Sequence, residues 1–220
     1  MYIRLIVTAL LAMLGLVLSG CGTTHATYRD AANLDIMLLG FDPVSYFTGA
    51  APLKGQSNLA ATHEGRTYHF SSTSNREIFV ANASRFEPQF GGFCSNGAAY
   101  GMKWASNPTS FEIVDDRLFI FSGEGSKSSW ALDKKANIAF GDGLWKSEME
   151  ATGWRWQSIK RMIFRVGHYK DTEELNARWQ KQFPGQLKPA PQNGGIWPNL
   201  TNPPVWQAAT GLGQEAIGWP

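Results

Sequence analysis

The chain has 220 residues, of which 43% are hydrophobic and 13% aromatic, so it is long enough for one ordinary domain with a buried core and appendages. Its 20 Lys and Arg residues and 18 Asp and Glu residues give a net charge of +2. This nearly balanced charge excludes a protein that binds nucleic acid by neutralising many phosphates, and we expect no nucleic-acid partner.

The first twenty residues have the composition of a secretory signal peptide. Arg4 is followed by an apolar run from Leu5 to Leu18. This run is too short to cross about 30 Å of hydrocarbon as a helix, which favours removal of residues 1–20 over a transmembrane segment. The residues Leu18-Ser19-Gly20-Cys21 resemble a bacterial lipobox. The resemblance implies that Cys21 becomes the first residue and carries acyl chains such as palmitate that anchor it to the membrane.

The residues after Cys21 bear on where the anchored protein resides. Gly22 stands where an inner-membrane retention signal would place Asp, so an outer-membrane protein facing the periplasm is favoured if the source is Gram-negative. Residues 21–35 are predicted to form a tether between the lipid and the fold. The chain has two cysteines, so acylation of Cys21 would leave Cys94 without a disulfide partner.

Residues 36–121 have the patterns of a small α+β module. A buried strand is expected at Ile36–Leu39, followed by a short helical turn that Asp42 caps. Two β-hairpins are predicted, one around Glu64-Gly65-Arg66 and one around Asp115-Asp116. Strands and helices alternate without long crossovers, which favours the α+β class.

The segment between the two hairpins is predicted to be a helix followed by a glycine-rich loop. Ser74 and Glu77 have the spacing of a capping box for a helix that ends near Ala83 and buries Ile78 and Phe79. The glycines of residues 91–97 indicate a loop around Cys94. In the strand before the helix, alternation places Tyr68 and Phe70 on the core face.

The order of these segments is similar to that of the YHS domain family. The resemblance covers residues 36–121 and rests on three motifs: Phe41-Asp42-Pro43-Val44-Ser45, Tyr68-His69-Phe70-Ser71-Ser72 and Gly91-Gly92-Phe93-Cys94. In the metal-transporter branch of that family, cysteines stand at the positions of Ser45, Ser71 and Asn75 here. The chain therefore resembles a cysteine-poor, lipoprotein branch of the family.

Cys94 is the first candidate for a metal ligand. Its thiolate, together with the imidazole of His69 or His63, would suit copper or zinc. Paired ligands two to four residues apart are missing, however, and a lone cysteine beside Phe93 is more often a small buried hydrophobe. His69 lies opposite the aromatic core face of its strand, where it either lines a ligand pocket or is a half-exposed strand histidine.

Motifs for catalysis are weak in this chain. There is no Gly-x-Ser-x-Gly elbow, no papain-like cysteine signature and no phosphate-binding loop. Asp115 and Asp116 are expected to be solvated at a hairpin tip. We therefore expect a protein that is not an enzyme and needs no cofactor, with copper or zinc as the alternative.

Residues 122–183 are predicted to form a helical extension, with amphipathic helices at Thr152–Val166 and Asp171–Phe183. For the first helix there are two alternatives. It buries Trp156, Ile159 and Ile163 against the module, or it places an aromatic and basic surface on an anionic bilayer. The residues of that membrane-surface alternative are Trp154, Arg155, Trp156, Lys160, Arg161 and Arg165. Residues 184–220 form a tail rich in Pro, Gly and Trp.

The sequence thus predicts a lipid-anchored binding or assembly protein of the bacterial cell envelope. Its expected partners are the membrane, through the anchor, and an envelope protein of unknown identity. Metal handling through Cys94 and His69, with His63 as a third ligand, is the alternative.

Overall fold

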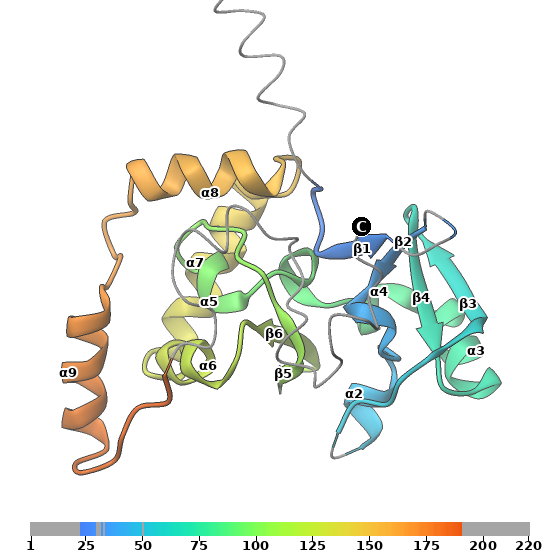
Figure 1. Cartoon of the computed structure of the whole chain (residues 1–220), viewed down its shortest axis with the longest axis horizontal. Helices are drawn as coiled ribbons and strands as arrows, with labels where there is room; N and C mark the ends of the chain where they lie inside the picture. The colour runs from blue at the N-terminus through green and yellow to red at the C-terminus, as the bar shows by residue number, and fades with distance from the viewer. Residues whose placement is uncertain (1–22, 30–31, 33, 50, 191–220) are drawn as a thin grey trace, which may run out of the picture.

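A computed structural model describes residues 23–29, 32, 34–49 and 51–190. The signal peptide at residues 1–20, the lipidated Cys21 and the tail from residue 191 onward lie outside the described residues. The fold is α+β, as the sequence predicts. In Figure 1 the N-terminal strands and the helices of the extension lie on opposite sides of the molecule, with β5 and β6 between them.

The larger sheet has four strands in the order β1-β2-β4-β3. The strands are β1 (Thr27–Arg29), β2 (Asp35–Met37), β3 (Gln56–His63) and β4 (Arg66–Phe70). β2 and β4 are parallel, and the other two pairs are antiparallel. Glu64 and Gly65 form the tight turn that joins β3 to β4. Both have positive φ, which gives the turn a twist that matches that of the strands.

The sheet includes part of the segment predicted as a tether. Thr27 pairs with Met37, and Ala26 is buried and donates its backbone N–H to the carbonyl of Gly91 at 2.8 Å. The tether prediction is therefore wrong for residues 23–29. A three-residue strand carries too little periodicity to be recognised without its partner strand.

One face of the sheet is covered by the helices α3 (Thr73–Ala81) and α4 (Ala83–Phe86). Tyr68 and Phe70 lie on this buried face, as predicted, and their rings contact the ring of Phe79. Phe79 is the buried apolar residue of α3, whereas Ile78 is exposed, because neighbouring residues on a helix point in different directions. The predicted burial of Ile78 is wrong.

The start of α3 also differs from the prediction. Its N-cap is Ser72, whose side-chain oxygen accepts the N–H of Asn75 at 3.1 Å. The helix therefore begins at Thr73, and the capping box predicted at Ser74 and Glu77 does not form. Only Ser71 and Ser72 separate the end of β4 from the start of α3, so the chain turns from strand to helix within two residues.

The second sheet is a hairpin of β5 (Asn107–Val114) and β6 (Arg117–Phe121). Asp115 and Asp116 form its turn, as predicted, and both have positive φ. Before this hairpin, η2 (Gln89–Gly92) and α5 (Ser95–Ala98) occupy the region predicted as a glycine-rich loop. Short helices of this kind show no repeating apolar pattern, which hides them in the sequence.

The helical extension begins directly after β6. It contains α6 (Glu124–Ala131), α7 (Lys134–Leu144), the π-helix η3 (Trp145–Met149), α8 (Trp154–Ile163) and α9 (Thr172–Gln182). Trp130 of α6 packs on Phe119 and Phe121 of β6, which joins the extension to the module. The start of α9 is capped by the Asp171 carboxylate, which accepts the N–H of Glu174 at 2.9 Å. A short α2 (Ser45–Thr48) contacts β5, where the ring of Tyr46 packs against that of Phe111.

Candidate functional site

The positions at which the resemblance places metal-binding cysteines converge on the buried carboxylate of Asp42. Its Oδ2 accepts hydrogen bonds from the backbone N–H and the hydroxyl of Ser71, at 2.8 and 2.6 Å, and from Nδ2 of Asn75 at 2.7 Å. Its Oδ1 accepts the N–H of Val44 at 2.9 Å, and the Ser45 hydroxyl donates to its backbone carbonyl at 2.7 Å. We call this group of residues the Asp42 cluster.

The Asp42 cluster is satisfied from within the protein. Its carboxylate accepts four hydrogen bonds, the Ser45 hydroxyl also accepts the N–H of Leu53 at 2.9 Å, and Asp42 and Ser45 are fully buried. A buried carboxylate that accepts this many hydrogen bonds needs no metal ion as a partner. The cluster therefore connects α2, β4 and α3 as a structural element.

Cys94 is fully buried in an apolar environment. It belongs to a cluster with Phe90, Phe119 and Trp130, and its Sγ lies 3.7 Å from the hydroxyl of Ser126. These surroundings are those of a small hydrophobic residue.

His69 is buried rather than half-exposed. A Cβ added to Gly40 would lie 3.0 Å from its Nδ1, and a Cβ at Gly55 would overlap its backbone at 2.4 Å. The half-exposed histidine expected on this strand is therefore not found. Among the residues that the structure describes, neither His69 nor Cys94 belongs to a group of three side chains able to hold a metal.

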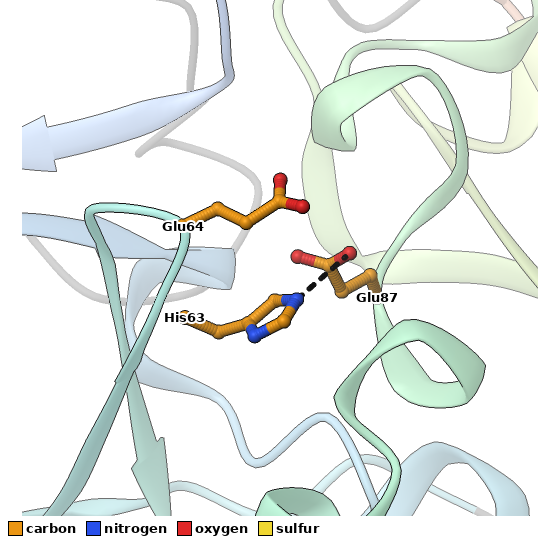
Figure 2. Close-up of side chains that lie close together, drawn as sticks. All are labelled: His63, Glu64 and Glu87. Atoms are coloured by element: carbon orange, nitrogen blue, oxygen red, sulfur yellow. Dashed lines mark ion pairs between the residues drawn. The ribbon is translucent and has the colours of Figure 1, made fainter.

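The third predicted metal ligand, His63, does lie in such a group. His63 and Glu64 end the β3 strand and begin its turn, and Glu87 follows α4. One ligand atom from each of the three lies within 4.8 Å of the others. Figure 2 shows the three side chains pointing toward one another, with Nε2 of His63 at 3.8 Å from Oε2 of Glu87. We call them the His63 cluster.

The Nε2 atom of His63 has no hydrogen-bond partner although it is buried from solvent. The distance of 3.8 Å to Oε2 of Glu87 is too long for a hydrogen bond. It is a suitable separation for two ligands of one metal ion, which each lie about 2.1 Å from the metal. Nε2 of His63 is thus an unused ligand atom, whereas the carboxylate of the Asp42 cluster has its hydrogen bonds filled.

Two neighbouring side chains hold the carboxylates of the His63 cluster. Nη2 of Arg66 donates to Glu64 at 2.7 Å and to Glu87 at 2.9 Å, and the Tyr68 hydroxyl donates to Glu87 at 2.8 Å. The hydrogen bond and charge of Arg66 lower the pKa of Glu64. Burial raises the pKa of Tyr68, so its hydroxyl remains a donor. The Arg66 charge also competes with any cation for the two carboxylates.

The two carboxylates of the His63 cluster, with Arg66 and Tyr68, line a cleft of about 250 Å³ between the hairpin and the extension. The side chains that carry its chemistry are His25, Glu64, Arg66, Tyr68, Glu87 and Trp145. Burial, followed by the charges of Arg66 and Lys103, lowers the pKa of His25 to about 4. The imidazole of His25 is therefore neutral at neutral pH.

Lys103 is fully buried and connects two segments of the chain. Its Nζ donates at 2.7 Å to the carbonyl of Thr24 and at 2.7 Å to that of Thr152. Burial lowers the pKa of Lys103 to about 7. Rings of Phe93 and Trp145 lie about 5 Å from the amine, at 5.1 and 4.8 Å. We call these contacts of Lys103 the Lys103 clamp.

The orientation of α8 differs from the predicted one. Its inward face carries Trp154, Gln157 and Ser158, and Trp156 and Ile163 are exposed. Gln157 donates to the carbonyl of Gly101 at 2.8 Å, so a polar residue occupies a place that the periodicity assigned to apolar ones. The predicted burial of Trp156 and Ile163 against the module is wrong.

The basic residues predicted for a membrane surface separate into two groups. Lys160 and Arg161 form ion pairs with Glu148, at 2.8 and 2.6 Å, and therefore fasten α8 to η3. Arg155 and Arg165 are exposed and stack on the rings of Trp154 and Tyr169.

The sequence identifies only part of this site. It predicts His63 as a ligand but not Glu64, Arg66 and Glu87, because the hairpin and the end of α4 bring these residues together from separate segments. The adjacency of His63 and Glu64 at a predicted turn is the one local signal that could have drawn attention to the pair.

None of the family models, curated proteins and solved structures compared with the chain matches it. In the described residues no helix has the length and apolar character required to traverse a bilayer.

Proposed function

We propose that the chain is a lipid-anchored protein of the bacterial cell envelope, with a YHS-like module that binds or assembles other molecules and is not an enzyme. The observation that carries this proposal is the lipobox-like Leu18-Ser19-Gly20-Cys21 directly before the fold. Thr23 is already held by the protein, because its carbonyl accepts the N–H of Trp154 at 3.1 Å. A lipid on Cys21 would therefore lie within a few residues of the folded body.

The anchor is tested by expressing the full chain in a bacterium supplied with a labelled fatty acid. We expect label on the protein, a mature mass that begins at Cys21 and recovery with the membranes. Cys21→Ser should lose the label and remain uncleaved, whereas Cys94→Ser, which changes the other cysteine, should behave as the unaltered chain. Label on the Cys21→Ser variant would overturn the proposed anchor.

The proposed outer-membrane location rests on Gly22. Separation of inner and outer membranes by density should place the protein in the outer-membrane fraction, and Gly22→Asp should move it to the inner membrane. The same location for both proteins would overturn sorting by this residue.

The proposal of a non-enzymatic role is supported by the arrangement of the reactive groups. Cys94 is enclosed by aromatic rings, and the carboxylate of Asp42 is fully used in hydrogen bonds. A screen for hydrolytic and redox turnover should detect no activity that Cys94→Ala removes. Robust activity abolished by Cys94→Ala would overturn this part of the proposal.

The second candidate function is metal binding, and the geometry favours the His63 cluster over Cys94 and His69. One imidazole nitrogen and two carboxylates are hard or borderline ligands, which suit zinc or copper(II) better than copper(I). The buried Nε2 of His63 without a partner is the observation that favours this function. Arg66 and Tyr68 would hold the outer carboxylate oxygens in place.

Calorimetry with zinc, and with copper(II), tests this second function. We expect one equivalent of metal per chain and an affinity reduced about tenfold or more by His63→Ala or Glu87→Gln. The matched control is His168→Gln, since His168 stacks on Phe140 outside the cluster. Equal affinity for the His63→Ala variant would exclude the cluster, and loss of binding in Cys94→Ser would restore the cysteine as the ligand.

A further inference from the structure

The outward side of α8 carries apolar residues that the fold leaves exposed. Trp156, Ile163 and Phe164 are 39%, 63% and 67% exposed. Ile163 and Phe164 follow Trp156 by seven and eight residues, so the three side chains lie along one side of the helix and at its C-terminal end. We call these three residues the α8 face.

The direction of the α8 face is fixed by the other side of the helix. Trp154 is buried with Ala26, Leu39 and Phe93, and Gln157 is fully buried with its hydrogen bond to Gly101. The ion pairs of Lys160 and Arg161 with Glu148 add further attachments. Rotation of α8 to hide its apolar face would break these contacts, so the face remains turned outward.

Basic residues stand at both ends of the α8 face. Arg155 lies in the first turn of α8, and Arg165 follows Phe164, the last residue of the α8 face. Both arginines are exposed. An exposed tryptophan among aliphatic and aromatic side chains, with arginines beside them, is the composition of a helix that lies in the interface of an anionic bilayer. Each exposed arginine near an anionic surface favours the contact.

The position of α8 relative to the start of the fold indicates the same surface. The N–H of Trp154, the first residue of α8, binds the carbonyl of Thr23. Cys21 precedes Thr23 by two residues, and two residues of extended chain span at most about 7 Å. The helix therefore starts beside the residue that the proposed function attaches to the membrane. Figure 1 shows α8 along the edge of the molecule where the described chain begins.

We propose that the α8 face, with Arg155 and Arg165 at its ends, lies on the surface of an anionic bilayer. The proposal deepens the proposed lipid anchoring, because the anchor would place α8 at the membrane. The contact itself depends on the described fold and can be measured without the lipid.

The first experiment uses the chain from residue 22 onward, which lacks Cys21 but keeps every described residue. It is sedimented with vesicles of phosphatidylglycerol and phosphatidylethanolamine, and with vesicles of phosphatidylcholine alone. We expect binding to the anionic vesicles that weakens as salt rises, and little binding to phosphatidylcholine. Indifference to lipid charge and salt, or no binding to either vesicle, would overturn the proposal.

Variants assign the binding to the α8 face. Replacing Trp156, Ile163 and Phe164 together by Ser should lower vesicle binding about tenfold or more. Arg155→Gln and Arg165→Gln should each lower it about fivefold. The matched control replaces Leu53 and Val80, which are 55% and 60% exposed on other segments, and should bind as the unaltered chain. Equal losses in the α8 variant and this control would overturn the assignment to α8.

The second experiment uses the full lipidated chain in the same anionic vesicles. A polarity-sensitive fluorophore is attached to Ile163→Cys or, as a control, to Val80→Cys, while Cys94 is buried and Cys21 is acylated. We expect a blue shift and quenching by brominated lipids at residue 163 alone. Equal responses at both sites overturn the α8 contact and leave lipidation intact. A chain without acyl groups instead contradicts the anchor and leaves the sedimentation result valid.

Discussion

The module contains two clusters of polar side chains that differ in whether their atoms have partners. In the Asp42 cluster the carboxylate accepts four hydrogen bonds from two segments of the chain. In the His63 cluster Nε2 of His63 is buried and has no hydrogen-bond partner. A complete set of hydrogen bonds indicates a cluster that stabilises the fold, whereas an unused ligand atom beside a cleft indicates one that binds something.

The largest expected change in the free energy of unfolding comes from the Asp42 cluster. Asp42→Ala removes the acceptor of Val44, Ser71 and Asn75, and leaves their donors buried without a partner. We expect a loss on the order of 4 kcal/mol in the free energy of unfolding. Urea unfolding followed by circular dichroism measures it, with the exposed Glu77→Ala as the control. A loss as small as that of the control would mean that the cluster is not a structural element.

A smaller effect tests whether the Asp42 cluster acts as one network. Ser71→Ala and Asn75→Ala each remove a side-chain donor to Asp42 and should each cost about 1 to 2 kcal/mol of unfolding free energy. Because both donors bind the same oxygen, the double variant should differ from the sum by about 0.5 kcal/mol or more. Strict additivity in this double-mutant cycle would show that the two residues act independently.

The third prediction concerns pH and the cleft. His25 has a pKa of about 4 in the folded protein and 6.5 as its ordinary value, so the unfolded chain binds more protons between these values. The free energy of unfolding should therefore fall as the pH drops from 6.5 to 4. Lys103, with a folded pKa of about 7 and an ordinary value of 10.5, should make it rise as the pH increases above 7.

Unfolding curves from pH 4 to 9.5 measure both slopes. His25→Gln should flatten the acidic slope and leave the alkaline one, whereas Lys103→Met should flatten the alkaline slope. An unchanged acidic slope in the His25→Gln variant would contradict the lowered pKa of that side chain.

The smallest expected change in the free energy of unfolding comes from the His63 cluster. His63→Gln removes a ring whose Nε2 makes no hydrogen bond, so the free energy of unfolding should change by less than about 1 kcal/mol. The same denaturant measurement checks it. A loss as large as that of Asp42→Ala would show that His63 stabilises the fold and would remove the contrast between the clusters.

The parts of the fold that the sequence predicts are those with strong local signals. Two residues suited to a turn stand between alternating segments in both hairpins, and Tyr68 and Phe70 follow the two-residue period of a strand. In α9 the Asp171 cap lies next to the helix that it starts. Such signals need no knowledge of the tertiary structure.

The orientation of α8 could not be predicted in this way. Trp154 and Trp156 are two residues apart on a helix and point to different sides, so composition alone does not say which one is buried. Gln157 is buried because its amide reaches the carbonyl of Gly101, 56 residues earlier in the chain. A tertiary partner thus overrides the apolar pattern.

The candidate site was predicted only in part for the same reason. His63 was a candidate ligand, but Glu87 joins it from 24 residues further along the chain, after the end of α4. Cys94 and His69 looked like ligands because of their chemistry, and both are buried in other surroundings. The residue types suggest metal binding, whereas the fold decides which of these residues lie close enough together to bind one metal ion.

The Lys103 clamp has a mechanical consequence for the proposed anchored protein. It holds Thr24 to Thr152, in the segment before α8. A force on the N-terminal end would therefore act on these buried hydrogen bonds. In the proposed anchored protein, the distance between the lipid and the folded body would then be limited to the reach of two residues, at most about 7 Å. A partner of such a protein would have to bind it close to the membrane surface.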